Sequence, residues 1–368
     1  MLTRKFQRSA LSLALSLTLF APASAFALTT AQAYSASGDP LLTIEFYDEG
    51  DVFTPPAPIE SDNVKEPKTS EGTLSADQKK SVGMAIDYAL GYVTQGRTYD
   101  SKGRMAVYVV HNGNASSAYI KGAENADGTY NTPIFDLVTQ DQLTRGVQVI
   151  FASDTEPVFT QPTPYFYPIV EKAGTQYASV IVHELGHSLG IVSEVDGGTT
   201  EKTLSEDLIR FDENGWTPFA DHLYSCMVWD ETAQKFRPDP SVPGVKATPG
   251  GLITLTPSPY VTDVLSETVT PTPADGGKFL VSAASTSGVY FRGPHVSEVL
   301  NGAFSNSIAV NGYEKHKDLQ KGVTTFYAEL SHLELERGLM GHQRYRNYTM
   351  FLEAELAVLQ DIGYDIDR

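Results

Sequence analysis

The sequence is poor in features that cross-link a chain or hold it in a membrane. Cys226 is the only cysteine among 368 residues, so no disulfide can form within the chain. After residue 27, no apolar run is long enough to cross a bilayer as a helix. With 41% hydrophobic residues the chain can still build a large core, which must be held together by packing and by bound ions.

Basic residues are scarce as well. The chain has 27 Lys and Arg residues against 45 Asp and Glu residues, and removal of residues 1–27 would leave 24 against 45, a net charge near −21. This negative charge disfavours a nucleic-acid partner, because the phosphate backbone is itself anionic. The charge is compatible with bound Ca²⁺, but neither an EF-hand loop nor glycine-aspartate nonapeptide repeats support calcium. No pattern indicates an oligomeric state.

Residues 1–27 have the pattern of an export signal. Three basic residues come first, residues 9–20 are apolar, and small side chains follow, so cleavage is expected after Ala25 or Ala27. A membrane anchor is the alternative interpretation, but the apolar run is short for a bilayer and Pro22 interrupts its end. The pattern therefore predicts an exported protein, extracellular or periplasmic, with no integral membrane segment once the signal is removed.

The rest of the chain divides into four segments. Residues 28–73 are polar and contain several prolines, so we expect a tail or linker, with a propeptide as an open alternative. Residues 74–190 have regular helix and strand patterns, and residues 191–325 predict an inserted, loop-rich lobe. Residues 326–368 form a C-terminal subdomain. The order of helices and strands is that of an α+β fold.

Individual helices and strands can be placed within these segments. Ser75 and Gln78 form a capping box before a helix whose apolar residues recur at helical spacing. A second helix is expected from about Thr175 to Gly190. The last helix is expected from about Asn347, with Gly363 as its stop. Short β-branched and aromatic runs predict strands at residues 105–111, 147–151, 252–255 and 289–291.

The second helix carries the sequence His183-Glu184-Leu185-Gly186-His187. Residues four apart lie on nearly the same side of a helix, so His183 and His187 can bind one cation. Glu184 is turned by about 100° from His183, which places its carboxylate beside the metal. Zinc lowers the pKa of a bound water, and such a carboxylate can take the proton and return it to a leaving amine. The pattern therefore indicates a hydrolytic zinc site with Glu184 as the catalytic base.

A surface helix with two solvated histidines is the alternative explanation of this motif. Three apolar residues, 180–182, directly precede it, which indicates that the helix is at least partly buried. Two buried imidazoles beside a carboxylate are unfavourable without a metal. The context therefore favours a metal site.

A catalytic zinc also needs a third protein ligand and one open position. Glu206 follows His187 at the sequence spacing at which one large class of zinc peptidases has a glutamate as its third ligand. The remaining candidates are the six other histidines, His111, His222, His295, His316, His332 and His342.

Two stretches together resemble a known family. Residues 183–190, HELGHSLG, are similar to the start of the metzincin signature, in which the glycine turns the chain off the helix. The compact form of that signature has a third histidine where this chain has Ser193, and serine is a poor zinc ligand. Ser331-His332-Leu333-Glu334, followed by Gly338-Leu339-Met340, resembles the leishmanolysin-like branch, in which a long insertion precedes the third histidine.

The resemblance implies a metzincin-like zinc peptidase domain of α+β type. Such a domain has an active-site helix, a small mixed sheet, here a large loop and strand insertion, and a helical C-terminal subdomain. His332 would complete the ligand set, and Met340 would belong to a turn that packs under the metal without binding it. Glu206 and His342 stay open as alternatives to His332.

Two further sites have open roles. His342 and Tyr345 follow the methionine turn, and either could donate a hydrogen bond to a developing oxyanion, although a surface position is the simpler interpretation. Cys226 could bind zinc in a latent form, but a buried free thiol is the simpler interpretation of a lone cysteine.

The motif and the export pattern predict a secreted zinc-dependent endopeptidase that acts on protein or peptide substrates. One alternative is an inactive binding or adhesion protein with the same fold, against which the intact Glu184 argues. Another is a zinc hydrolase of a non-protein amide such as a cell-wall crosslink, which the motif alone does not exclude.

The third ligand can be tested by metal content. His332→Ala should lower the zinc bound per chain, because two histidines alone leave the ion with too few protein ligands. Glu206→Ala should leave the zinc content unchanged. Zinc would be measured by atomic absorption on dialysed wild type and both variants. Loss of zinc in Glu206→Ala with retention in His332→Ala would assign the ligand to the glutamate instead.

Overall fold

The structure is a computed structural model of the chain. It describes residues 28–54, 67–109, 116–119, 131–141, 148–152, 177–193, 195–196, 208–211, 216–225, 227–230, 232, 235–238, 245–249, 252–254, 289–310, 313–318, 323–328, 330–333, 335, 338–341 and 351–367. The predicted export signal, residues 1–27, lies outside them.

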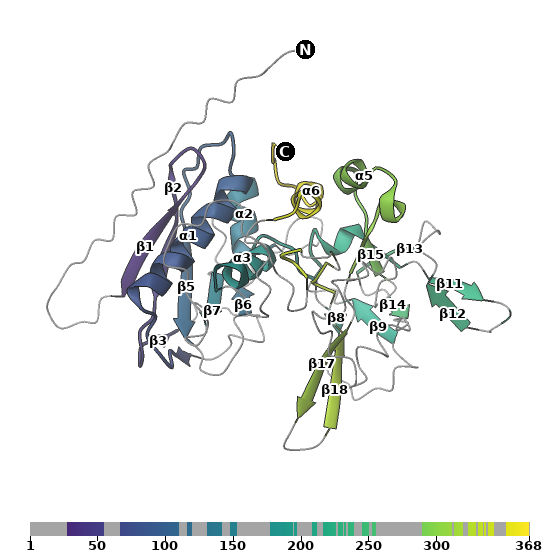
Figure 1. The fold of residues 1–368 in the computed structure, drawn as a ribbon, viewed down its shortest axis with the longest axis horizontal. Helices are drawn as coiled ribbons and strands as arrows, with labels where there is room; N and C mark the ends of the chain where they lie inside the picture. Colours follow the sequence, from purple (N-terminus) through teal and green to yellow (C-terminus); the bar gives the residue numbers. More distant parts are fainter. Residues whose placement is uncertain are drawn as a thin grey trace, which may run out of the picture.

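A five-stranded mixed sheet forms one side of the molecule (Figure 1). Its order is β1-β2-β5-β7-β6, in which β2, β5 and β7 run parallel and both outer strands are antiparallel to their neighbours. Within the described residues, the predicted strands at 105–111 and 147–151 are confirmed as β5 and β7, which pair with each other. The five strands are β1 (Thr29–Tyr34), β2 (Pro40–Phe46), β5 (Gly103–Val109), β7 (Gln148–Ala152) and β6 (Ser116–Tyr119).

The prediction of a polar tail or linker over residues 28–73 is wrong for the described part. β1 and β2 pair along their whole length, and β2 joins β5 in the central sheet. Ala33, Leu42 and Ile44 are buried. As the outer strand of the sheet, β1 exposes part of its surface, which accounts for its threonines and glutamine. An edge strand therefore has a composition that resembles a linker. A small pair, β3 (Val52–Phe53) and β4 (Lys68–Thr69), follows in the same segment.

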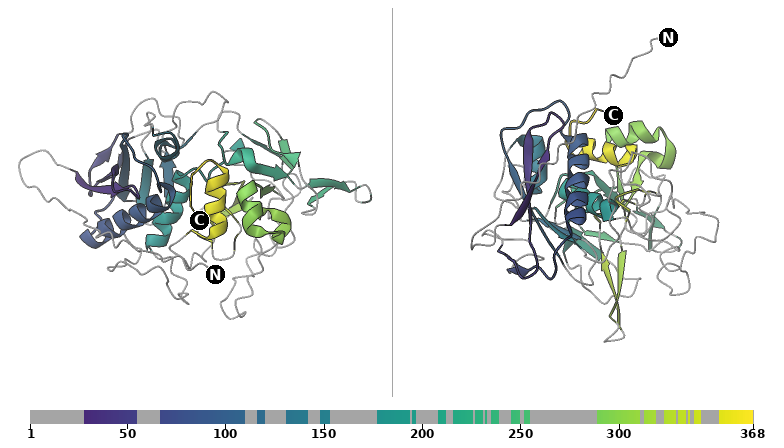
Figure 2. Two further views of the ribbon diagram at one scale, coloured as in Figure 1. Left: turned by 90° about the horizontal axis from the view of Figure 1, so that it is seen from above. Right: turned by 60° about the vertical axis from the view of Figure 1, so that its left-hand side comes forward.

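Helices α1 and α3 lie side by side against this sheet (Figures 1 and 2). α1 (Ala76–Val93) contacts β1, and α3 (Tyr177–Ser188) contacts β6 and β7. The capping box predicted for α1 is confirmed, because Gln78 N donates to Ser75 Oγ at 3.2 Å and Ser75 N donates to Gln78 Oε1 at 2.8 Å. The apolar stripe of α1 is buried as predicted: Val82, Ala85, Ile86, Ala89, Leu90 and Val93. A shorter helix, α2 (Pro133–Gln140), contacts both β5 and α3.

The described part of the predicted lobe, residues 191–325, consists mainly of short antiparallel sheets. Two sheets have the orders β13-β10-β15-β16 and β14-β9-β8, and the hairpins β11–β12 and β17–β18 project from the body of the molecule (Figures 1 and 2). The strands predicted at 252–255 and 289–291 are confirmed as β14 and β15. The bounds are β8 (Val195–Asp196), β9 (Leu208–Phe211), β10 (Leu223–Ser225), β11 (Met227–Asp230), β12 (Lys235–Pro238), β13 (Val245–Lys246), β14 (Leu252–Thr254), β15 (Val289–Phe291), β16 (Ile308–Ala309), β17 (Tyr313–Asp318) and β18 (Val323–Ala328).

Part of this lobe belongs to the main core. Phe219, Phe291 and Val296 share one buried apolar cluster with Ile181 and Leu185 of α3. The lobe also contains the 3-10 turns η2 (Ala220–His222) and η4 (Ala303–Asn306), together with α5 (Pro294–Leu300), which packs against the final helix.

The final helix, α6 (Glu353–Asp361), begins later than the predicted start near Asn347. Phe351 and Leu352 are extended or irregular, and Leu352 occupies the N-cap position. The predicted stop at Gly363 is confirmed, since this residue has φ +124 and its N–H donates back to Gln360 O at 3.1 Å. The described residues therefore form a mixed α+β fold, and none of their helices has the length and hydropathy needed to cross a membrane.

Asp87 on α1 links the helix to β1 and gives the fold a pH dependence. Its Oδ1 accepts a hydrogen bond from Tyr34 N at 2.8 Å, while burial raises the pKa of Asp87 to about 6. The folded state then binds a proton more tightly than the unfolded state does, so ionisation of Asp87 lowers the free energy of unfolding as the pH rises from about 4 to about 6.

Asp87→Asn should therefore be more stable than wild type above pH 6, by roughly 1 kcal/mol because the carboxyl is partly solvated. Asparagine keeps the acceptor for Tyr34 but carries no charge. The difference should vanish near about pH 4, where Asp87 is neutral in wild type as well. Urea unfolding of both proteins across this range measures it, and a variant that is less stable at pH 8 would contradict the assignment.

Candidate metal centre

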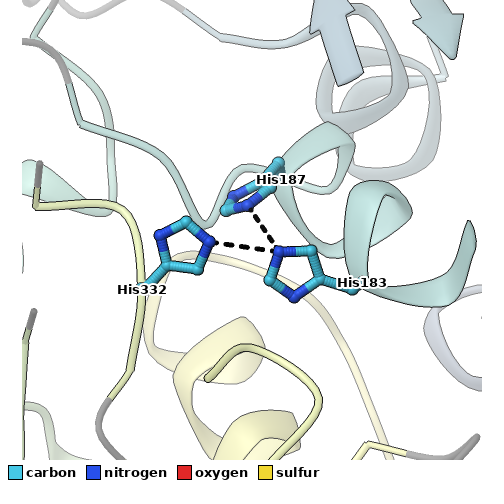
Figure 3. Close-up of side chains that lie close together, drawn as sticks. All are labelled: His183, His187 and His332. Atoms are coloured by element: carbon cyan, nitrogen blue, oxygen red, sulfur yellow. Dashed lines mark hydrogen bonds between the residues drawn. The ribbon is translucent and has the colours of Figure 1, made fainter. Parts of the chain in front are cut away.

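Three histidines meet between helix α3 and the chain segment that follows the lobe (Figure 3). His183 and His187 lie one helical turn apart on α3, and His332 comes from the irregular residues 330–333. The Nε2 atom of His183 lies 3.1 Å from the Nε2 atoms of both other histidines. All three potential ligand atoms lie within 4.8 Å of one another, and this is the one such His, Cys, Asp or Glu group found among the described residues. These three histidines could hold a metal ion.

Hydrogen bonds to backbone carbonyls determine which imidazole nitrogens point into this group. His183 Nδ1 contacts Leu339 O, and His187 Nδ1 lies 2.8 Å from Ile191 O. A carbonyl oxygen only accepts hydrogen bonds, so each Nδ1 carries the hydrogen and each Nε2 of the neutral ring has a lone pair. Metal-binding histidines commonly have this second hydrogen bond, which sets the tautomer and the ring orientation.

The converging lone pairs fit a single cation. The lone pairs of His183 and His187 face each other at 3.1 Å and repel, while His183 and His332 are buried, at 1% and 7% exposure. A shared proton can link two of the nitrogens, whereas a metal ion binds all three. Tetrahedral zinc with bonds of about 2.0–2.1 Å separates its ligand nitrogens by about 3.3–3.4 Å, close to the separation here.

The C-terminal cap of α3 places the Ile191 carbonyl. Gly190 has φ +105, and the cap is closed by Gly190 N to His187 O at 2.9 Å and Ile191 N to Gly186 O at 3.1 Å. This pair of bonds is the Schellman motif, which requires a left-handed residue and therefore favours glycine. The sharp turn brings the Ile191 carbonyl back over the imidazole of His187. The glycine that the sequence pattern marked as a helix stop thus also orients a candidate ligand.

Ser193 occupies the position where the compact form of the metzincin signature has its third histidine. In this structure Ser193 makes hydrogen bonds to the segment that carries His332. Its hydroxyl donates to Leu330 O at 2.8 Å, and its N–H donates to Ser331 Oγ at 3.1 Å. Ser331 Oγ in turn donates to Ser193 O at 3.1 Å. These contacts join residues 138 positions apart and place His332 directly after a segment fixed to the end of α3.

Met340 packs against Gly186 of α3, a contact that the sequence analysis missed. Met340 is completely buried, and a Cβ built on Gly186 would overlap its sulfur and lie 3.0 Å from its Cε. The glycine in the middle of the HELGH motif therefore makes room for the methionine. A glycine within an otherwise regular helix was the available signal, because it lowers helix stability unless close packing requires it.

Glu355 of α6 contacts the turn that contains Met340. Its Oε1 accepts from Met340 N and its Oε2 from Leu352 N, both at 2.7 Å. Burial raises the pKa of Glu355 to about 7, and the backbone N–H groups of Leu352, Met340 and Leu339 act in the opposite direction. The sequence pattern placed Glu355 on the last helix but gave it no role at the site.

The structure describes the positions of some of the other sequence candidates. Glu184 is on α3 next to His183 and is buried, 6% exposed. His222 lies on η2, where its Nδ1 is 3.0 Å from Arg292 O, outside the histidine group. Several candidates lie outside the described residues, so the structure does not test them: His111, Glu206, Cys226, Glu334, His342 and Tyr345.

Comparison with protein-family models, with curated proteins and with solved structures finds no match for this chain.

The contact between Gly186 and Met340 can be tested with Gly186→Ala. Alanine ordinarily stabilises a helix interior by roughly 0.5–1 kcal/mol relative to glycine. Here we expect a loss of about 1–3 kcal/mol in unfolding free energy from overpacking, because Met340, which the added Cβ would meet, is completely buried. The matched control is Gly91→Ala on α1, where a Cβ meets nothing within 4 Å. Denaturant unfolding of both variants measures the contrast, and equal stabilisation of the two would contradict it.

Proposed function

We propose that this protein is an exported zinc-dependent endopeptidase with a metzincin-like site of the leishmanolysin-like branch. The observation that carries the proposal is the convergence of the His183, His187 and His332 Nε2 atoms in a buried position beside Glu184. Residues 1–27 support export by their sequence pattern alone.

The donor set favours zinc. Three imidazoles and no thiolate leave one coordination position for water or substrate, as in catalytic rather than structural zinc sites. Neutral imidazole suits zinc better than calcium or magnesium, which prefer oxygen ligands. When bound, zinc supplies a Lewis acid that polarises the scissile carbonyl and lowers the pKa of a water molecule towards neutrality.

The protein's own residues supply the proton transfer. Glu184 follows His183 on the same helix, so its carboxylate leaves α3 about 100° around the axis from the imidazole. In this proposal Glu184 takes the proton from the attacking water and later returns it to the leaving amine nitrogen. Its burial strengthens electrostatic interactions with the reacting groups, since the surroundings screen charge weakly.

The sheet next to α3 has an edge strand, β6, to which an extended peptide could bind. β6 is the last strand in the sheet order and contacts α3, and none of the described residues pairs with its outer edge. A peptide can add to such an edge through main-chain hydrogen bonds, which recognise any sequence in extended form. This favours a peptide-bond substrate over a cell-wall amide, which cannot form a regular strand ladder.

Glu184→Gln tests the mechanism, since glutamine keeps the shape but cannot accept the proton. The variant should retain zinc and lose about 10²–10⁴-fold in turnover of casein or of a mixed peptide library. Glu353→Gln, an exposed carboxylate on α6, is the control and should keep wild-type turnover.

Full activity in Glu184→Gln would remove the catalytic base from the mechanism. Zinc-loaded wild type that cleaves neither substrate would favour the binding protein or the non-protein amide hydrolase, and release of fragments from purified peptidoglycan would then separate these two.

A further inference from the structure

The carboxyl group of Glu355 is placed in an unusual way for a residue near the start of a helix. An N3 glutamate in a capping box ordinarily contacts only the N-cap backbone N–H. Glu355 Oε2 makes this contact with Leu352 N, but Oε1 accepts from Met340 N, 15 positions earlier in the chain. The side chain is completely buried, at 0% exposure. Burying a charged group is unfavourable, so capping α6 alone does not account for it.

The turn around Met340 has space and hydrogen-bond donors for this carboxylate. A Cβ built on Gly338 would lie 2.8 Å from Glu355 Oε1, so a larger residue there would displace the carboxylate. Leu333 N donates to Met340 O at 2.9 Å, which closes the turn onto the residue after His332. Both oxygens of Glu355 face N–H donors, the arrangement of an ionised carboxylate that accepts at each oxygen. Because burial raises the pKa of Glu355 to about 7, the ionised form predominates above that pH.

The peptide group between Leu339 and Met340 connects the carboxylate with the metal centre. The N–H of this group, on Met340, donates to Glu355, and its C=O, on Leu339, accepts from His183 Nδ1. Because a peptide group is planar, fixing its N–H also fixes the direction of its C=O. Each hydrogen bond in such a series also polarises the next.

We propose that Glu355 is a positioning residue of the metal centre, which orients the His183 imidazole and increases its basicity through the Leu339–Met340 peptide group. Carboxylates that contact a metal-binding histidine directly have this effect. Here a peptide group is interposed, and ionised Glu355 polarises it so that its C=O becomes a stronger acceptor for the ligand without a direct contact. The inference rests on the proposed metal site, because it concerns one of that site's ligands.

Glu355→Gln tests the inference by metal affinity. Glutamine has the same size, but its NH₂ group would face one of the two N–H donors, so one of the hydrogen bonds is lost. We expect zinc affinity, measured by competition with a chromophoric chelator, to fall about 10–100-fold. The visible absorption of the cobalt(II)-substituted protein should shift as well, because the orientation of a ligand changes.

Asp361→Asn is the matched control. Asp361 is also on α6, and its two oxygens accept from His295 N at 2.8 Å and Val296 N at 3.0 Å on α5, away from the histidines. This variant should lose stability but keep the affinity and the cobalt spectrum of wild type. If Glu355→Gln also keeps both, Glu355 only caps α6 and the inference is overturned. If wild type itself binds neither metal, the proposed function fails together with the inference.

A second measurement needs no stable Glu355 variant. With ¹⁵N-methionine and ¹⁵N-leucine labelling of wild type, the Met340 amide proton should move downfield when zinc binds, because the ion strengthens the hydrogen bonds of the connected series. The Leu352 amide, which contacts the other oxygen of Glu355, should move much less. Met340→Leu assigns the signal among the six methionines. Equal shifts of the two amides would overturn the inference.

Discussion

The structure depends on one electrostatic constraint, the convergence of imidazole lone pairs in a buried position. His183 and His187 each use Nδ1 to donate to a backbone carbonyl, which leaves Nε2 as an acceptor pointing towards His332. Such nitrogens repel one another unless a cation lies between them. The surrounding contacts hold these two acceptors of α3 and the His332 imidazole close enough together to bind one ion.

These contacts come from parts of the sequence that are far apart. Ser193 and Ser331 join the end of α3 to the segment with His332, and Tyr364, three residues after the end of α6, donates to Leu189 O at 2.8 Å. Each hydrogen bond contributes only about 0.5–1.5 kcal/mol. Together they connect α3, which precedes the lobe in the chain, to the residues that follow it. The apolar cluster that runs from α3 into the lobe adds the larger, non-directional stabilisation.

The contact between Gly186 and Met340 shows how closely α3 and the turn that contains Met340 approach each other. Gly186 allows Met340 to lie against α3, and this places the Leu339 carbonyl within reach of His183. The position of this carbonyl depends in turn on the Met340 N–H and its carboxylate partner, Glu355. Packing, main-chain geometry and ligand orientation are thus coupled in one turn, which is why a buried methionine and a buried carboxylate occur together there.

The sequence by itself determined the features that depend on local periodicity. These are the cap of α1, the strands β5 and β7, the turn at Gly190 and the placement of His183, Glu184 and His187 on one helix. Each depends on residues close together in the chain; His183 and His187, for example, share a helix face because they are four residues apart. Family resemblance, not periodicity, suggested His332, whose approach to α3 depends on contacts such as that of Ser193. The strand β1, the packing of Gly186 and the role of Glu355 were decided only by the tertiary structure. An edge strand has the composition of a linker, and a glycine or a glutamate acquires its function from a partner that no local pattern specifies.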